Sequence, residues 1–274
     1  LVSLRSGDHV EPVAAALKKA EKSLVLLGNI AARHEAYANV RALAAKIADT
    51  TSSKLGSLSS GANSAGLSLA GVLPHRAPGG QSRSAAGAGA GSMLDQSLET
   101  VALLNVEPDA DLLAVPDAVG KLGKQQFVVA MTPFVSESLL ETADLLLPIG
   151  TFAETSGTYV HVAGTWQSIA GAPNTVGEAR PAWKVLRVIG TLLGADGFAY
   201  VTSEDVLREI RAELGGVVPD NSYTGDRKLA KANGEDAAAA EIDVPLYSVD
   251  AMVRRARALQ LTKAARQAAA GDEA

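Results

Sequence analysis

Four short apolar runs occur between residues 24 and 147 of the chain. They are Leu24–Leu27, Val101–Leu104, Phe127–Ala130 and Leu145–Leu147. Runs of this length are typical of buried strands, and segments with helical periodicity separate them. Because strands that alternate with helices favour a parallel sheet, the pattern predicts an α/β fold with a doubly wound, mainly parallel sheet.

The pattern changes after the fourth run. Residues 158–163 alternate between two faces, and Ala163-Gly164 supplies a turn before residues 165–167. This arrangement predicts a β-hairpin. Helical spacing then recurs in segments that begin near Pro181 and Ser203 and in a last one over residues 249–260. We therefore predict an α/β domain over residues 1–200 and a helical C-terminal extension over residues 201–274.

Two segments lack a clear period. Residues 52–91 are rich in Gly, Ser and Ala, which predicts a long ordered loop with a short helix near Ala65–Ala70. Ser92 and Asp95 have the spacing of a capping box and predict a short helix through Leu98. Residues 216–241 are polar and rich in Ala and Asp, which indicates a loop or linker.

Composition narrows the function classes. The 274 residues include 25 basic and 30 acidic side chains, a balance that argues against a nucleic-acid partner. The chain has no cysteine, so no iron–sulfur cluster is held through Cys in this segment. No apolar run approaches the roughly 20 residues of a membrane helix, so we expect no direct membrane insertion. The first residue is Leu1, which suggests a fragment of a longer polypeptide.

Candidate site residues follow the predicted strands, where open α/β sheets bind ligands. Gly28 ends the first strand, but the three glycines of a dinucleotide fingerprint are absent. Glu107 and Asp109 follow the second strand and Glu154 the fourth. Either acid–base chemistry or loop solvation and helix capping would suit these carboxylates. Asn63, in the glycine-rich loop, could hold a ligand or stabilise the loop.

Two further features stay open from the sequence alone. Four histidines are present, and none is spaced as a metal pair, so no metal site is expected. His161 suits a structural or interface role better than that of a ligand. The cluster Arg254, Arg255 and Arg257 is most simply a solvated helix face, and docking onto an acidic partner is its functional alternative.

One long string carries a family resemblance. ETADLLLPIGTFAETSGTYVHVAGTWQSIAGA, over residues 141–172, resembles the end of the third domain of molybdopterin oxidoreductases. The chain is more closely similar to the large iron–sulfur subunit of bacterial respiratory complex I, NADH:quinone oxidoreductase. The supporting strings are GANSAGLSLAGVLPHR, LLNVEPDADL, GEARPAWKVLRVIGTLLG and VRRARALQLT, which are collinear with the family and span nearly the whole chain.

The resemblance implies a cofactor site that has lost its cofactor. In the enzymatic relatives the hairpin bears an Asn-x-Glu-x-Arg pattern beside the pterin, whereas this chain has His161, Ala163 and Thr165 at those places. On this basis molybdopterin is expected to be absent and no residue is expected to be catalytic. The residues Gly28, Asn63, Glu107, Asp109 and Glu154 would then line a vestigial cleft.

The same resemblance implies a role in respiration. The chain would be a non-catalytic structural segment of the peripheral arm of complex I, on the cytoplasmic side of the inner membrane. It would contact other subunits of that arm, and electrons would pass from NADH to quinone through 2Fe–2S and 4Fe–4S clusters held in N-terminal segments. The alternatives are a pterin-binding segment of a molybdenum or tungsten oxidoreductase, such as a formate dehydrogenase, and a free nucleotide-binding domain.

Overall fold

A computed structural model describes residues 10–32, 34, 36–58, 61–217, 223–229, 246–248 and 250–271. The chain divides into two compact units. Unit 1 comprises Leu1–Ala65, Val160–Thr165 and Val218–Val244, and unit 2 comprises Gly66–Tyr159, Trp166–Val217 and Pro245–Ala274. The division predicted at residue 200 stays a prediction.

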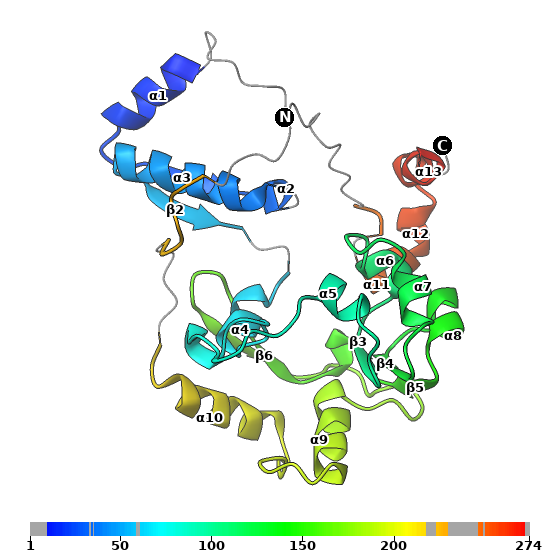
Figure 1. Ribbon diagram of the computed structural model, residues 1–274. Coiled ribbons are helices and arrows are strands. Elements are labelled where there is room, and N and C mark those ends of the chain that lie inside the picture. The colour runs from blue at the N-terminus through cyan, green and yellow to red at the C-terminus, as the bar shows by residue number, and fades with distance from the viewer. Residues whose placement is uncertain are drawn as a thin grey trace. The chain divides into compact units, whose positions relative to one another are not determined.

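Unit 1 contains a single strand–helix–strand motif (Figure 1). Its elements are α1 (Val10–Lys19), β1 (Leu24–Leu27), α2 (Asn29–Ala32), α3 (Tyr37–Thr51) and β2 (Lys54–Ser57). The two strands are parallel, with Leu24 opposite Lys54 and Leu27 opposite Ser57. Helix α3 contacts both strands and buries only alanines, so it can pack closely against the sheet.

Strand β2 lies where the sequence predicts a loop. Its sequence, KLGS, carries a single large apolar residue, Leu55, and therefore lacks the pattern that marks a strand. Its strand conformation comes from pairing with β1 along its whole length. The prediction of a continuous loop over residues 52–91 is wrong for these four residues. The short helix predicted near Ala65–Ala70 is confirmed as α4 (Ser64–Leu69).

Unit 2 is built on a three-stranded parallel sheet in the order β3-β4-β5. The elements of this region are α5 (Ala90–Leu94), β3 (Val101–Leu104), α6 (Pro108–Asp111), α7 (Ala118–Leu122), β4 (Val128–Thr132), α8 (Glu137–Thr142) and β5 (Leu145–Pro148). Leu103, Ala130 and Leu146 lie side by side in the register of the three strands. Each strand except the last is joined to the next through helices, as in βαβ units.

The core of unit 2 lies on one face of this sheet. Leu94 of α5, Leu122 of α7 and Leu139 of α8 pack there with Leu103 of β3 and Val128 of β4. Burying a leucine of this kind stabilises the fold by about 1.5–3 kcal/mol. The helices therefore fix the sheet whose carboxyl end carries the candidate site.

The remaining elements form the hairpin and the C-terminal helices. They are two 3₁₀ turns, η1 (Pro78–Gly80) and η2 (Phe152–Glu154), the strands β6 (Gly157–Val160) and β7 (Trp166–Ile169), and the helices α9 (Ala182–Leu192), α10 (Ser203–Leu214), α11 (Ala251–Arg255), α12 (Arg257–Gln260) and α13 (Lys263–Gly271). Strands β6 and β7 pair as the predicted hairpin. Gly164, in the left-handed region at φ 86°, makes the turn between them.

The expected fold class is confirmed: the chain is α/β, with parallel sheets, a hairpin and C-terminal helices. The four expected strands are divided between two sheets, because β1 pairs with β2 and with no other described strand. The helix predicted from Ser92 to Leu98 is wrong, since α5 already ends at Leu94. The helix predicted over residues 249–260 is broken at Ala256, where ψ is 87°.

Two points concern segments that the structure describes incompletely. Val249 and most of the loop predicted over residues 216–241 lie outside the described residues. Within the described ranges, no helix combines the length and the apolar character needed to cross a membrane.

Candidate functional site

The candidate site begins where β3 ends. Asn105 follows this strand in the left-handed region at φ 54°, a conformation that asparagine tolerates better than most residues. Its backbone N–H donates to the carbonyl oxygen of Met131 in β4 at 2.8 Å. The chain therefore turns sharply at the carboxyl end of the sheet and brings Glu107 to the start of α6.

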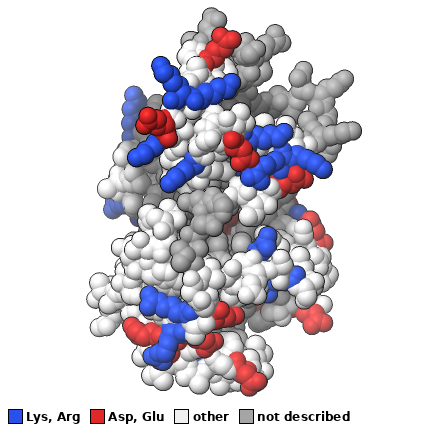
Figure 2. Space-filling model, turned by 90° about the vertical axis from the view of Figure 1, so that its left-hand side faces the viewer, with Lys and Arg blue, Asp and Glu red and all other residues white. Residues whose placement is uncertain are grey.

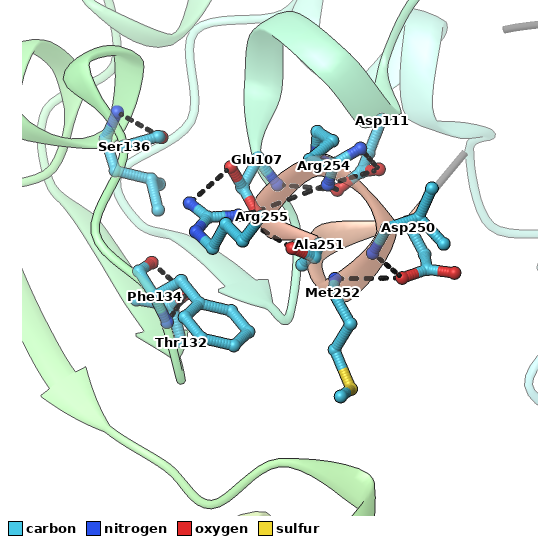
Figure 3. Close-up of polar contacts among 12 residues, drawn as sticks. Glu107, Asp111, Thr132, Phe134, Ser136, Asp250, Ala251, Met252, Arg254 and Arg255 are labelled. Atoms are coloured by element: carbon cyan, nitrogen blue, oxygen red, sulfur yellow. Dashed lines mark hydrogen bonds and ion pairs between the residues drawn. The ribbon is translucent and has the colours of Figure 1, made fainter. Parts of the chain in front are cut away.

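Glu107 is buried, with 6% of its surface exposed. Arg255 of α11 donates to both of its carboxylate oxygens, at 2.8 Å to Oε1 and 3.0 Å to Oε2 (Figure 3). Arg254 donates to Oε1 at 3.2 Å. A planar guanidinium matches a carboxylate in this two-bond arrangement, which is stronger and more directional than a single ion pair.

Asp111 completes the arrangement. Its Oδ1 accepts bonds from both terminal nitrogens of Arg254 at 3.1 Å, and its Oδ2 accepts from the backbone N–H of Glu107 at 2.8 Å. Two carboxylates and two guanidiniums thus share one site, called here the arginine–carboxylate cluster: Glu107, Asp111, Arg254 and Arg255. Its charges balance, which a buried group of this kind requires.

The cluster reaches a second strand through Arg255. The guanidinium carbon lies 4.5 Å from the centre of the Phe134 ring, a cation–π contact. Phe134 follows β4, and Figure 3 shows its ring beside Arg255. Helix α11 therefore lies over the carboxyl ends of both β3 and β4, the place where open α/β sheets bind ligands.

The protonation of Glu107 follows from these contacts. Burial of its carboxyl group favours the neutral form, but the hydrogen bonds and charges of Arg255 and Arg254 outweigh this effect. The pKa of Glu107 is lowered below its ordinary value. Glu107 is therefore ionised at neutral pH and is a poor candidate for a general acid.

Local bonds hold α11 in place. Asp250 caps the helix, and its Oδ1 accepts from the backbone N–H groups of Met252 and Val253 at 2.8 and 2.9 Å. The Gln260 side chain donates to the carbonyl oxygens of Tyr247 and Val253. These bonds hold the C-terminal segment, and with it Arg254 and Arg255, in position.

The interpretation of the arginines as a solvated helix face is wrong for Arg254, whose side chain is only 13% exposed. The side chain of Arg255 is 33% exposed, and its guanidinium is nevertheless bonded to Glu107. The acidic group onto which they dock belongs to the same chain. Among the carboxylates, Glu107 is buried rather than solvated.

The other carboxylate candidates, Asp109 and Glu154, accept hydrogen bonds from neighbouring groups of unit 2. Asp109 accepts a hydrogen bond from the hydroxyl group of Ser138 at the start of α8. Glu154 accepts from the backbone N–H of Thr151 at 2.7 Å and from its hydroxyl group at 2.9 Å. These bonds to Thr151 lower the pKa of Glu154. Capping, one of the roles open from the sequence, is therefore what the geometry of Glu154 shows, whereas Asp109 joins α6 to α8.

The remaining candidates belong to unit 1. Asn63 accepts, through Oδ1, a hydrogen bond from the backbone N–H of Val160 at 2.8 Å, so it ties the glycine-rich loop to the hairpin. The ring Nδ1 of His161 accepts from the backbone N–H of Ala163 at 3.1 Å. At Gly28 no atom lies within 4 Å of the position that a Cβ would take.

A pterin cofactor carries phosphate, which proteins bind with backbone N–H groups or with available cations. At the carboxyl ends of β3 and β4, the guanidiniums of Arg254 and Arg255 are already bonded to carboxylates. In the hairpin, Ala163 offers only a methyl group. These described residues do not fit an anionic cofactor. Nor do the described residues contain a group of three or more His, Asp or Glu that could hold a metal ion.

No curated protein matches the chain. The sequence model of the molybdopterin oxidoreductase family matches residues 4–192, which is more than half of the chain and includes β3, β4, β5 and the hairpin. The chain belongs to the molybdopterin oxidoreductase family.

Proposed function

We propose that this chain is a non-catalytic structural segment of the peripheral arm of NADH:quinone oxidoreductase, complex I. It binds no molybdopterin and supports neighbouring cluster-bearing segments and subunits. Electrons pass from NADH to quinone through iron–sulfur clusters held elsewhere. The assembled complex lies at the cytoplasmic side of the inner membrane, and this segment reaches the membrane only through other subunits.

The main observation that supports the proposal is the arginine–carboxylate cluster. An active site at the carboxyl end of a parallel sheet needs a space that a substrate or cofactor can enter. Here Arg255 bonds to Glu107 and covers Phe134, so the chain's own C-terminal helix occupies that edge. An edge closed by four mutually paired charges favours a structural role over catalysis.

The strings shared with the large iron–sulfur subunit of complex I, over residues 61–76, 103–112, 177–194 and 253–262, support the same proposal. Two of them contain the cluster: Glu107 and Asp111 lie in LLNVEPDADL, and both arginines lie in VRRARALQLT. The ion pairs therefore join two of the strings that carry the resemblance.

The second candidate is a pterin-binding segment of a molybdenum or tungsten oxidoreductase. Membership of the molybdopterin oxidoreductase family favours it, because that family includes enzymes that use the cofactor. The lack of charged residues at His161, Ala163 and Thr165 is the observation against it.

Affinity purification of the tagged full-length protein from its source cells tests the proposal. The expected result is recovery of NADH:quinone oxidoreductase activity together with subunits that carry iron–sulfur clusters. Recovery of the protein alone, or with bound pterin, would overturn the proposal. Tagging a second protein of similar abundance from the same cells controls for incidental recovery of the complex.

A further inference from the structure

Among the described residues of unit 1, the sheet has one face covered by α3 and one open face. Helix α3 contacts both strands, and exposure alternates along β1, with Leu24 and Leu26 more exposed than Val25 and Leu27. Leu24 and Leu26 are 56% and 50% exposed. Because successive side chains of a strand point to opposite faces, these two leucines lie together on the open face.

A glycine deepens this face into a hollow. A Cβ at Gly56 of β2 would lie 3.1 Å from Cδ1 of Leu26 and 3.7 Å from Cδ1 of Leu24. The leucines therefore border the space above Gly56. The hollow measures about 500 Å³, and its lining is mostly apolar: Leu24, Leu26, Leu55, Leu58, Val162 and Ala163, with Lys54, Gly56 and Ser57.

Such a face normally has a cover. Parallel sheets occur almost only with both faces covered by helices, and a sheet of two strands is marginal without further packing. Leucines that are half exposed around a hollow indicate an interaction site rather than scattered surface residues. The cover that fits a parallel sheet is an amphipathic helix, whose apolar stripe lies on the strands.

The charge of a residue that lines the hollow indicates the chemistry of the partner. Lys54 lines it and lies opposite Leu24 in the strand register. No acidic side chain among the described residues lines the hollow. In Figure 2 lysine and arginine side chains are prominent over α1, α3 and β2, with acidic side chains among them.

We propose that the open face of β1 and β2 binds an amphipathic helix of a partner protein with acidic flanks. The apolar stripe of that helix enters the hollow above Gly56, and an Asp or Glu side chain on its flank pairs with Lys54. This inference does not depend on the proposed role in complex I, since it rests on the sheet of unit 1 alone.

Two designed peptides test the proposal with the full-length chain. Both carry the same leucine stripe on a labelled helix; one is flanked by Glu and the other by Lys. Fluorescence anisotropy should show saturable binding of the Glu-flanked peptide, about tenfold tighter than the Lys-flanked one, because rim charges of opposite sign attract and those of like sign repel. Lys54→Glu should reverse the preference, and Lys46→Glu, on the exposed side of α3, should leave it unchanged.

A second variant tests the contribution of the apolar hollow separately from that of the Lys54 charge. Leu26→Asp should abolish binding of the Glu-flanked peptide, with circular dichroism and the melting temperature confirming that the variant is folded. Equal affinity for the two peptides, or binding that survives both Leu26→Asp and Lys54→Glu, would overturn the proposal. So would self-association in sedimentation experiments that Leu26→Asp removes, since the occupant would then be a second copy of the chain.

Discussion

Arg255 donates to both carboxylate oxygens of Glu107, at 2.8 and 3.0 Å, although the two residues are 148 positions apart in the sequence. This contact joins the C-terminal helix α11 to the loop that follows β3. Since Arg254 binds the same carboxylate and Asp111, the contact is part of a network rather than a single ion pair. It closes the edge of the sheet at which a ligand would be expected.

Removing the central carboxylate should release the C-terminal segment. Glu107→Ala leaves two partly buried guanidiniums short of a partner, so we expect the free energy of unfolding to fall by about 3 kcal/mol. Urea denaturation measures this change, and hydrogen exchange of the amides in α11 and α12 should accelerate. Arg257→Ala, which removes an exposed side chain of the same segment, is the control. Equal effects of the two substitutions would contradict the account of the cluster.

The same carboxylate should make stability depend on pH. The pKa of Glu107 is lower in the folded chain than its ordinary value of about 4.3, so the folded state favours the ionised form. The stabilisation is present in full above the ordinary pKa and is lost as pH falls through the lowered one. The difference in urea midpoint between the wild type and Glu107→Gln should therefore shrink from pH 7 to pH 3. A constant difference would show that the charge of Glu107 contributes nothing.

The hydrogen bond between Asn63 and Val160 of the hairpin should depend only on an acceptor oxygen at position 63. Oδ1 of Asn63 accepts from the N–H of Val160, so Asn63→Ala leaves that donor unpaired and should cost about 1 kcal/mol of unfolding free energy. Asn63→Asp keeps the acceptor and should be close to the wild type. The proton resonance of the Val160 amide reports the bond directly. If Asn63→Asp lowered the free energy of unfolding as much as Asn63→Ala does, the result would contradict this role.

A glycine in α9 should resist replacement. A Cβ at Gly190 would overlap a carbon of the Phe198 ring, so Gly190→Ala forces the ring or the helix to move. Alanine favours a helix over glycine by about 1 kcal/mol, yet we expect Gly190→Ala to destabilise the chain by about 1–3 kcal/mol through overpacking.

Gly91 in α5 provides the matched control for this substitution. Its Cβ would meet only Val115, at 4.0 Å, so Gly91→Ala should be neutral or stabilising. Thermal melts of the two variants give the comparison. Stabilisation by Gly190→Ala would mean that Phe198 does not pack against the helix as described.

The sequence patterns predicted the helices and strands whose conformation depends on their own residues. The four apolar runs became β1, β3, β4 and β5 within two residues of their predicted bounds. Strand β2 was missed because its conformation depends on β1 and not on its own side chains. The break at Ala256 was missed for a similar reason, since helical periodicity continues through it.

The arginine–carboxylate cluster could be predicted only in part. The position of Glu107 after a buried strand marked it as a candidate, and an acidic partner was one of two interpretations of Arg254 and Arg255. Nothing in the spacing of these residues indicates that they meet, because chain separation does not encode tertiary contact. Arginines on surface helices are usually solvated. Arg254 is an exception because α11 packs at the end of the sheet, where Glu107 binds it.

The cofactor content of the purified full-length protein tests the central claim most directly. The chain should be produced in cells that make molybdopterin and are supplied with molybdate and tungstate, beside a molybdenum enzyme purified from the same cells as a positive control. If its own arginines close the edge of the sheet and the hairpin lacks cofactor ligands, elemental analysis and pterin fluorescence should find neither metal nor pterin in proportion to the chain. One metal and its pterin per chain would contradict the account.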